Sequence, residues 1–172
     1  MYTDYLEIKV DGNVNSINRF FTEIHSVFKF NNIRFAIDFP SSYLKKVEDK
    51  TITSLGDTIR VFSEKENIQF LIGNKKISNL IDIISPVVKI GNVDINSIKK
   101  KCCIYRVRDP ERKFELSDDF NFITYFKKDG SKNIKVPIFF VKEYTYDSKN
   151  NEGKLNSFGL SSITNKVFIP SF

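Results

Sequence analysis

The sequence predicts an α+β fold in which an N-terminal sheet covered by helices precedes a strand-rich C-terminal region. Several short segments alternate apolar and polar residues, which is typical of half-buried strands. Two segments between them repeat apolar residues at helical spacing, and the chain beyond about residue 97 has strand patterns and turn signals without that spacing. The chain has 172 residues, of which 41% are hydrophobic and 28% charged, so it can bury a core.

A strand and a helix are predicted first. Residues 5–10 place Leu6, Ile8 and Val10 on one face, and the Asp11-Gly12-Asn13 segment is a turn signal. Residues 17–28 repeat apolar side chains every three or four positions, which predicts a helix. We expect Asn15 or Ser16 to cap its start, and we expect it to end near Lys29.

The next elements complete a first domain over residues 1–96. Residues 33–39 alternate up to Pro40, residues 41–57 are polar and predict a long loop, and residues 58–62 predict a third strand. Ser63 and Glu66 form a capping-box pattern for a second helix that stops at Gly73, and residues 80–90 predict a strand interrupted by Pro86. This order is the split pattern of a ferredoxin-like domain, with helices on one face of an antiparallel sheet.

Residues 97–172 predict a second, strand-rich domain. Residues 102–108 read as a strand, and residues 120–126 and 134–144 read as a hairpin around the turn dipeptide Asp129-Gly130. Residues 158–172 form an apolar tail that begins next to Gly159.

Composition excludes several kinds of function. Lys and Arg exceed Asp and Glu, which gives a net charge of +6 and favours a polyanionic partner. The chain has two cysteines and one histidine, so a disulfide scaffold, a four-cysteine zinc site and a mechanism with two histidines are excluded. We find no metal-ligand spacing and no Gly-rich phosphate loop, so no cofactor or metal is expected. No apolar run could span a bilayer and no signal peptide is visible, so we expect a cytoplasmic protein without a membrane partner.

His25 is the first candidate for chemistry. Phe21 and Phe28 are its helical neighbours, which places it at the border of the predicted buried stripe. An imidazole there could be a general acid or base, or a boundary residue without a role.

Two arginines and several lysines are candidates for binding an anion. Arg106 and Arg108 share one face of a predicted strand, which suits phosphates or a guanine edge but also fits ordinary solvated charge. Lysine clusters weakly indicate a polyanion, and they lie at Lys45-Lys46, Lys75-Lys76, Lys99-Lys101 and Lys127-Lys128, with Lys132 and Lys135 nearby.

Several motifs along the full chain match one family. They are Tyr5-Leu6-Glu7-Ile8, residues 33–40, Leu55-Gly56 with Ile59-Arg60-Val61, Arg106-Val107 with Pro110-Glu111-Arg112, Phe122-Ile123-Thr124, Phe158-Gly159-Leu160-Ser161 and Val167-Phe168-Ile169-Pro170-Ser171-Phe172. With these motifs the chain resembles the crRNA-processing endoribonuclease of type I-F CRISPR systems, a member of the CRISPR repeat-cleaving superfamily.

The resemblance implies a function and a set of site residues. Such enzymes cut precursor RNA at the 3′ base of a repeat hairpin without a metal, leave a cyclic phosphate and a 5′-hydroxyl, and retain the hairpin within a surveillance complex. His25 falls at the family's catalytic histidine, and Lys127 or Ser131 falls at or near its catalytic serine. The expected RNA-binding residues, all in the strand-rich domain, are Arg106, Arg108, Arg112, Lys113, Lys128, Lys132 and Phe158. The implied partners are the repeat hairpin and other subunits of a type I-F effector complex.

The sequence departs from the family at three points. The arginine-rich helix that follows the Pro-Glu-Arg segment is missing or reduced to a turn, Lys127 replaces a serine, and Phe158 replaces a tyrosine. Two alternatives therefore stay open: an inactive subunit that binds the repeat hairpin, and a basic ferredoxin-like interaction protein without an RNA role.

Overall fold

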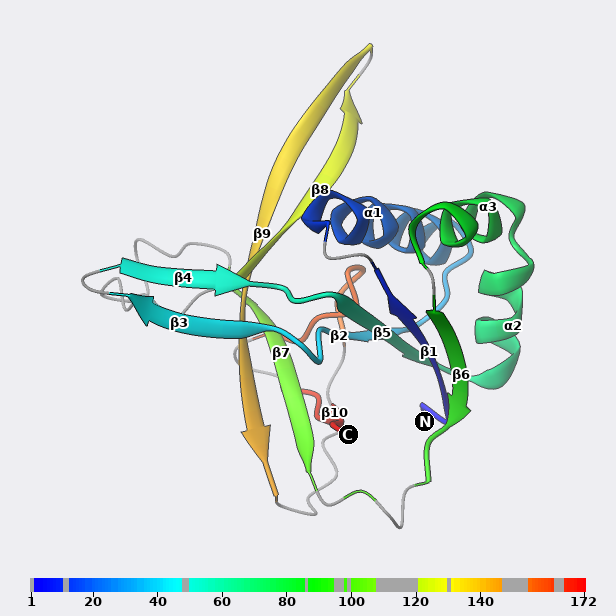
Figure 1. The fold of residues 1–172 in the computed structure, drawn as a ribbon. Helices are drawn as coiled ribbons and strands as arrows, with labels where there is room; N and C mark the ends of the chain where they lie inside the picture. The colour runs from blue at the N-terminus through cyan, green and yellow to red at the C-terminus, as the bar shows by residue number, and fades with distance from the viewer. Residues whose placement is uncertain are drawn as a thin grey trace.

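The computed structural model describes residues 2–10, 13–47, 50–85, 87–94, 98, 100–107, 121–129, 131–146, 155–162 and 166–172. Over these residues the fold is α+β, with three helices and two four-stranded antiparallel sheets (Figure 1). The α+β prediction is therefore confirmed. No helix within the described ranges is both long and apolar enough to cross a membrane.

The first sheet is assembled from strands of the N-terminal half. Its order is β2-β5-β1-β6, and its strands are β1 (Asp4–Lys9), β2 (Ala36–Asp38), β5 (Thr58–Ser63) and β6 (Val87–Asn92). The three helices, α1 (Val14–Phe30), α2 (Lys65–Gly73) and α3 (Lys75–Ile84), lie along one side of it in Figure 1. Burial of Leu6 and Ile8 from β1 against the apolar stripe of α1 holds these two layers together.

The second sheet has the order β10-β7-β9-β8. Its strands are β7 (Lys101–Val107), β8 (Asn121–Asp129), β9 (Lys132–Thr145) and β10 (Ile169–Pro170). The predicted hairpin around residues 129–130 is confirmed, with Asp129 paired to Lys132 across the turn. The apolar core runs from α1 into this sheet through Ile123 and Ile138.

Helix α1 also covers the open edge of the second sheet. The backbone N–H of Thr124 donates to Asn18 Oδ1 at 2.9 Å, and that of Phe126 donates to Thr22 Oγ1 at 3.1 Å. Since an uncovered edge strand exposes unpaired backbone groups, these side chains satisfy two backbone donors of β8.

A charged network joins the two sheets. Lys142 Nζ on β9 lies 2.6 Å from the buried Asp38 Oδ1 on β2. Arg60 on β5 is also buried, where it pairs with Glu7 and donates to the backbone oxygen of Phe172 at 3.0 Å. The guanidinium of Arg60 lies over the Phe172 ring, 4.4 Å from its centroid, so the C-terminal tail is attached to the first sheet.

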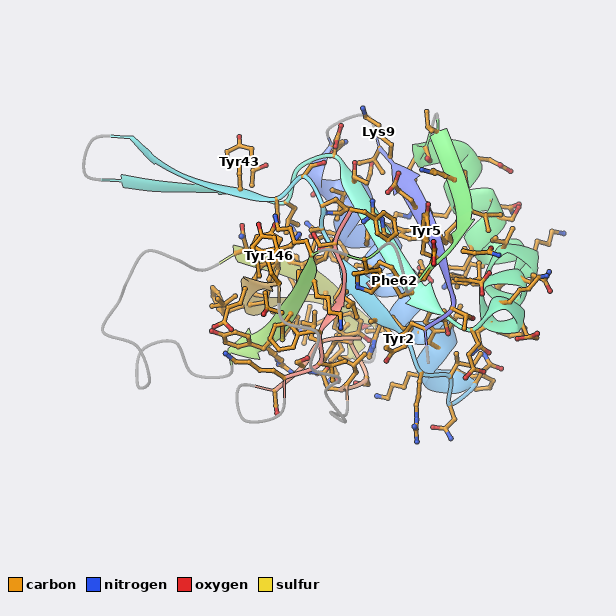
Figure 2. The ribbon with its side chains drawn as sticks, turned by 90° about the horizontal axis from the view of Figure 1, so that it is seen from below. Tyr2, Tyr5, Lys9, Tyr43, Phe62 and Tyr146 are labelled. Atoms are coloured by element: carbon orange, nitrogen blue, oxygen red, sulfur yellow. The ribbon has the colours of Figure 1, made fainter. Side chains whose placement is uncertain are left out.

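Two element predictions are wrong. Residues 41–57 are not a long loop, because β3 (Tyr43–Val47) and β4 (Lys50–Ser54) pair as a hairpin that extends away from both sheets (Figure 2). Residues 80–84 are not strand, because they end α3. The buried residues of α3 recur at helical spacing, and they are Ile77, Leu80, Ile81 and Ile84.

The predicted helix caps are also wrong. The N-cap of α1 is Asn13, whose side chain accepts from Asn15 N. The N-cap of α2 is Glu64, which makes no side-chain cap bond, and Ser63 Oγ instead donates to the carbonyl of Arg34. Ser63 therefore ties the start of α2 to the segment before β2.

Candidate functional site

His25 lies on the face of α1 that is turned toward the second sheet. Three polar residues, Asn18, Thr22 and His25, follow one another at helical spacing and are all buried. The first two bind the edge of β8, so the same face brings His25 against Tyr125 on that strand, with ring centroids 4.9 Å apart and an interplanar angle of 89°.

One hydrogen bond fixes the imidazole of His25. Its Nδ1 lies 2.5 Å from the carbonyl oxygen of Ser157. Since a carbonyl can only accept, Nδ1 carries the proton and donates it. The neutral ring then has its lone pair on Nε2, which is the arrangement that a general base needs.

Aromatic rings cover the imidazole. The Phe158 ring stacks on it with centroids 4.1 Å apart and an interplanar angle of 16°, and only 2% of His25 is exposed. Burial lowers the pKa of His25 below its ordinary value; the hydrogen bond to Ser157 opposes this effect, and the nearby Lys29 charge adds to it. The ring is therefore neutral near pH 7. His25 is not at a solvent boundary as expected, because the second sheet and residues 157–158 cover it.

The segment 155–161, which we call the site loop, holds both His25 and β7. Asn156 Oδ1 accepts from the N–H groups of Phe158 at 2.8 Å and Leu160 at 3.3 Å, which closes the loop on itself. Gly159 has φ +71 and packs against Phe35. Ser161 then pairs with β7, where its carbonyl accepts from Arg106 N at 3.0 Å.

The Phe158 ring contacts both His25, the candidate general base, and Arg106, a candidate RNA-binding residue. The Arg106 guanidinium lies over the Phe158 ring, 5.2 Å from its centroid, while the same ring stacks on His25. The fold thus brings together His25, Arg106 and Phe158, three of the residues selected from the sequence. Arg106 and His25 thus both contact the Phe158 ring, and a guanidinium is suited to binding a phosphate or a guanine edge.

The other candidates lie farther along the β8–β9 hairpin. Lys127 is exposed and shares a strand face with Tyr125, about 7 Å farther along β8 at the usual rise per residue. Lys128 is exposed on the opposite face, and Ser131 and Lys132 lie at the hairpin turn, which extends past α1 in Figure 1. Arg108, Arg112 and Lys113 lie outside the described residues, so their predicted roles stay predictions.

Sequence reasoning missed the groups that hold the site. The carbonyl of Ser157 has no signal in the residue type, since any residue could supply it. Asn18 and Thr22 had a signal: with His25 they form a polar row inside an otherwise apolar helix face, which indicates a helix that docks on a polar edge.

Comparison with known proteins identifies no family. No protein-family model matches the chain, and no curated protein matches it significantly. Within the part of the chain that the structure describes, no three His, Cys, Asp or Glu residues group to hold a metal ion.

Proposed function

We propose that this chain is a metal-independent endoribonuclease that binds an RNA repeat hairpin and cuts at its 3′ base. The neutral imidazole of His25, with Nδ1 bound to the Ser157 carbonyl and Nε2 unprotonated, is the observation that carries the proposal. The strand order β2-β5-β1-β6, with helical connections between β1 and β2 and between β5 and β6, supports a ferredoxin-like unit over residues 1–96.

The chemistry requires one base and a stabilised phosphate. His25 Nε2 accepts the proton of the 2′-hydroxyl, whose oxygen forms a bond to the adjacent phosphorus. The bond from phosphorus to the 5′-oxygen breaks, and that oxygen takes a proton from water, which leaves a cyclic phosphate and a 5′-hydroxyl. Lys127 offsets phosphate charge from β8, and Arg106 reads the base of the stem.

Cleavage requires that the cover over His25 opens. A stacked aromatic pair contributes about 0.5–1.5 kcal/mol beyond the area it buries, which RNA binding can supply. We therefore infer that bound RNA shifts the Phe158 ring and exposes Nε2.

The segment where the family has its arginine-rich helix lies outside the described residues, and we propose that the lysines of the β8–β9 hairpin make the stem contacts. Lys127, Lys128, Lys132 and Lys135 are all exposed on the hairpin. A protein contacts mostly phosphates and 2′-hydroxyls along an A-form stem, so exposed lysines suffice there. The retained hairpin would place the chain in a cytoplasmic type I-F effector complex with other subunits.

A second candidate function is hairpin binding without cleavage. The 2% exposure of His25 favours it, because a base that stays covered cannot reach a hydroxyl. In that case His25 is only a packing residue beneath Phe158.

Incubation of labelled repeat RNA in EDTA separates these functions. His25→Ala should lower the cleavage rate by about 100- to 10,000-fold while hairpin binding changes only a few-fold. Ser26→Ala is the matched control, since Ser26 is the exposed neighbour on α1 and should cut normally. RNA bound uncut by the parent protein would establish the second function, and no binding at all would contradict both.

A further inference from the structure

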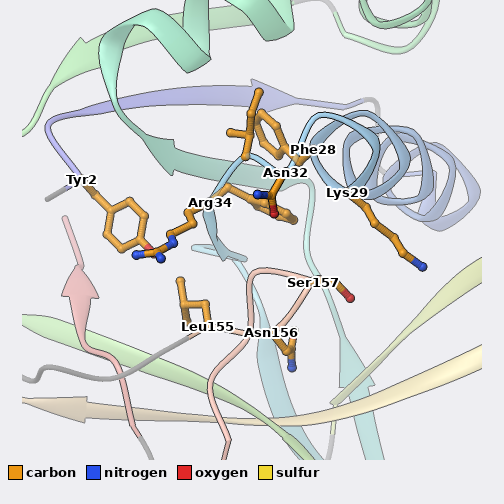
Figure 3. A pocket seen from close by; sticks show the side chains of 10 residues that line it. Tyr2, Phe28, Lys29, Asn32, Arg34, Leu155, Asn156 and Ser157 are labelled. Atoms are coloured by element: carbon orange, nitrogen blue, oxygen red, sulfur yellow. The ribbon is translucent and has the colours of Figure 1, made fainter.

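A cleft opens on the other side of the site loop from Arg106. It has a volume of about 360 Å³ and lies between the C-terminal end of α1, residues 32–35 and residues 155–157 (Figure 3). Its size is at the lower end for small-ligand sites. Ser157 lines this cleft and also binds His25, so the cleft begins where the proposed active site ends.

The cleft is cationic at its rim. Lys29 and Arg34 line it and are exposed, and neither forms an ion pair with another described residue. Its lining includes no carboxylate among the residues that the structure describes. An anion in this cleft therefore meets two positive charges and no opposing one.

The walls of the cleft carry groups suited to binding a nucleobase. Tyr2 is half-buried at the opening, beside Arg34 in Figure 3, and burial raises the pKa of its hydroxyl to about 12 against the opposing effect of Arg34. The hydroxyl therefore stays a donor. Asn32 and Asn156 both line the cleft, and Asn156 Oδ1 is used inside the site loop. Aromatic rings, amides and cations together are the usual components of a single-strand binding site.

We propose that this cleft binds the unpaired nucleotide on the 3′ side of the scissile phosphate. The inference rests on the proposed function. Successive contacts connect Arg106 to the cleft: Arg106 contacts Phe158, Phe158 stacks on His25, His25 binds Ser157, and Ser157 lines the cleft. With the stem base at Arg106 and the scissile phosphate at His25, the strand leaving the hairpin enters the cleft.

The positively charged lining does not continue far beyond this cleft. A second hollow adjoins the cleft at Tyr2 and Arg34 and is lined at its far end by Ser63, Glu64 and Asn67. The Glu64 carboxylate repels a further phosphate, so specificity is confined to the first unpaired nucleotide.

Binding of three uncleavable RNAs, each with a 2′-deoxy nucleotide at the cut site, tests the inference. The RNAs are the hairpin alone, the hairpin with three added 3′ nucleotides and the hairpin with three added 5′ nucleotides. The 3′ extension should tighten binding about five- to tenfold, the low end for stacking one base on an aromatic side chain. Arg34→Gln and, separately, Lys29→Gln should remove most of that gain and lower the salt slope of the extended RNA by about 0.7 for each lost phosphate contact.

Lys89→Gln is the matched control, since Lys89 is an exposed lysine on β6, at the edge of the first sheet opposite β2, and should keep the full gain. Thermal unfolding of each variant verifies that it is folded. The proposed role of the cleft would be refuted if the 3′ extension gave no gain in affinity, or if the 5′ extension gave an equal gain. It would also be refuted if the gain survived both cleft substitutions. In each of these cases the proposed hairpin function would still stand. If the parent protein does not bind the hairpin alone, both proposals fail.

Discussion

Substitution of Gly159 by alanine tests how the site loop is held. Gly159 has φ +71, a backbone conformation that L residues other than glycine rarely adopt. A Cβ added there would lie 2.6 Å from Phe35 Cε2 and 2.8 Å from Phe35 Cδ2. The Phe35 ring cannot easily retreat, because it is 3% exposed and packs on Phe28 with centroids 4.6 Å apart.

The expected loss of stability has two parts. The left-handed conformation costs a residue with a Cβ about 1–2 kcal/mol. Forcing an extra carbon into a packed core costs about 1–3 kcal/mol more. Gly159→Ala should therefore lower the free energy of unfolding by about 2–5 kcal/mol. Since the Gly159 carbonyl also accepts from Ile37 N at 3.2 Å, the loop should shift away from β2 as well as from His25.

Gly73→Ala is the matched control for this experiment. Gly73 ends α2, and a Cβ there would meet nothing within 4 Å, so alanine should be neutral or stabilise by up to about 1 kcal/mol. Urea unfolding of the three proteins measures both changes, and hairpin cleavage by folded Gly159→Ala should be slowed because His25 loses its support. Equal unfolding free energies for the two variants would refute the account of the loop.

Three further predictions concern the site and its docking. Burial lowers the pKa of His25 below its ordinary value of 6.5, so below that pH the unfolded chain binds a proton that the folded protein does not. The free energy of unfolding should thus fall as pH drops from 6.5 through the lowered pKa, and His25→Phe should remove that part of the slope in urea titrations across pH 5–8. Arg106→Ala should reduce discrimination against altered stem-base pairs by about 1–3 kcal/mol in competitive binding, whereas equal losses on all stems would make Arg106 a phosphate contact. Thr22→Val should cost about 1–3 kcal/mol of stability because Phe126 N loses its acceptor, and an unchanged melting curve would argue against docking of α1 on β8.

The elements with one buried face could be read from the sequence. Strand β1 alternates because only one of its faces meets α1, and the long helix α1 repeats its apolar residues over several turns. The β8–β9 hairpin carried its own turn signal at residues 129–130. In each case the pattern itself lies within one short stretch of chain, wherever its packing partner lies.

The wrong predictions of elements and helix caps arose where the local sequence pattern was ambiguous or absent. Residues 80–84 contain a short run of Leu and Ile that fits a strand as well as the last turn of a helix. The β3–β4 hairpin extends away from the sheets, so its polar sequence resembled a loop. Capping by Glu64 rather than by Ser63 depends on the carbonyl of Arg34, which reaches Ser63 only in the folded chain.

The candidate site could be predicted in its residues but not in its geometry. His25, Arg106 and Phe158 were selected from the sequence, and the fold brings them into contact. The burial of His25 could not be foreseen, because its cover comes from Tyr125 and residues 157–158, a hundred or more residues away in sequence. The cleft beside it likewise joins residues near both ends of the chain.

The way the site loop closes on α1 bears on how the protein is made. The ribosome adds about 5–20 residues per second, so α1 emerges several seconds before residues 155–161. Until then the imidazole has neither its carbonyl partner nor its stacked ring. Contacts between segments so far apart in sequence form late and slow the folding of a domain. A nascent chain that lacks residues 155–161 thus has no ordered imidazole at position 25, and the candidate site forms only when that segment has been synthesised.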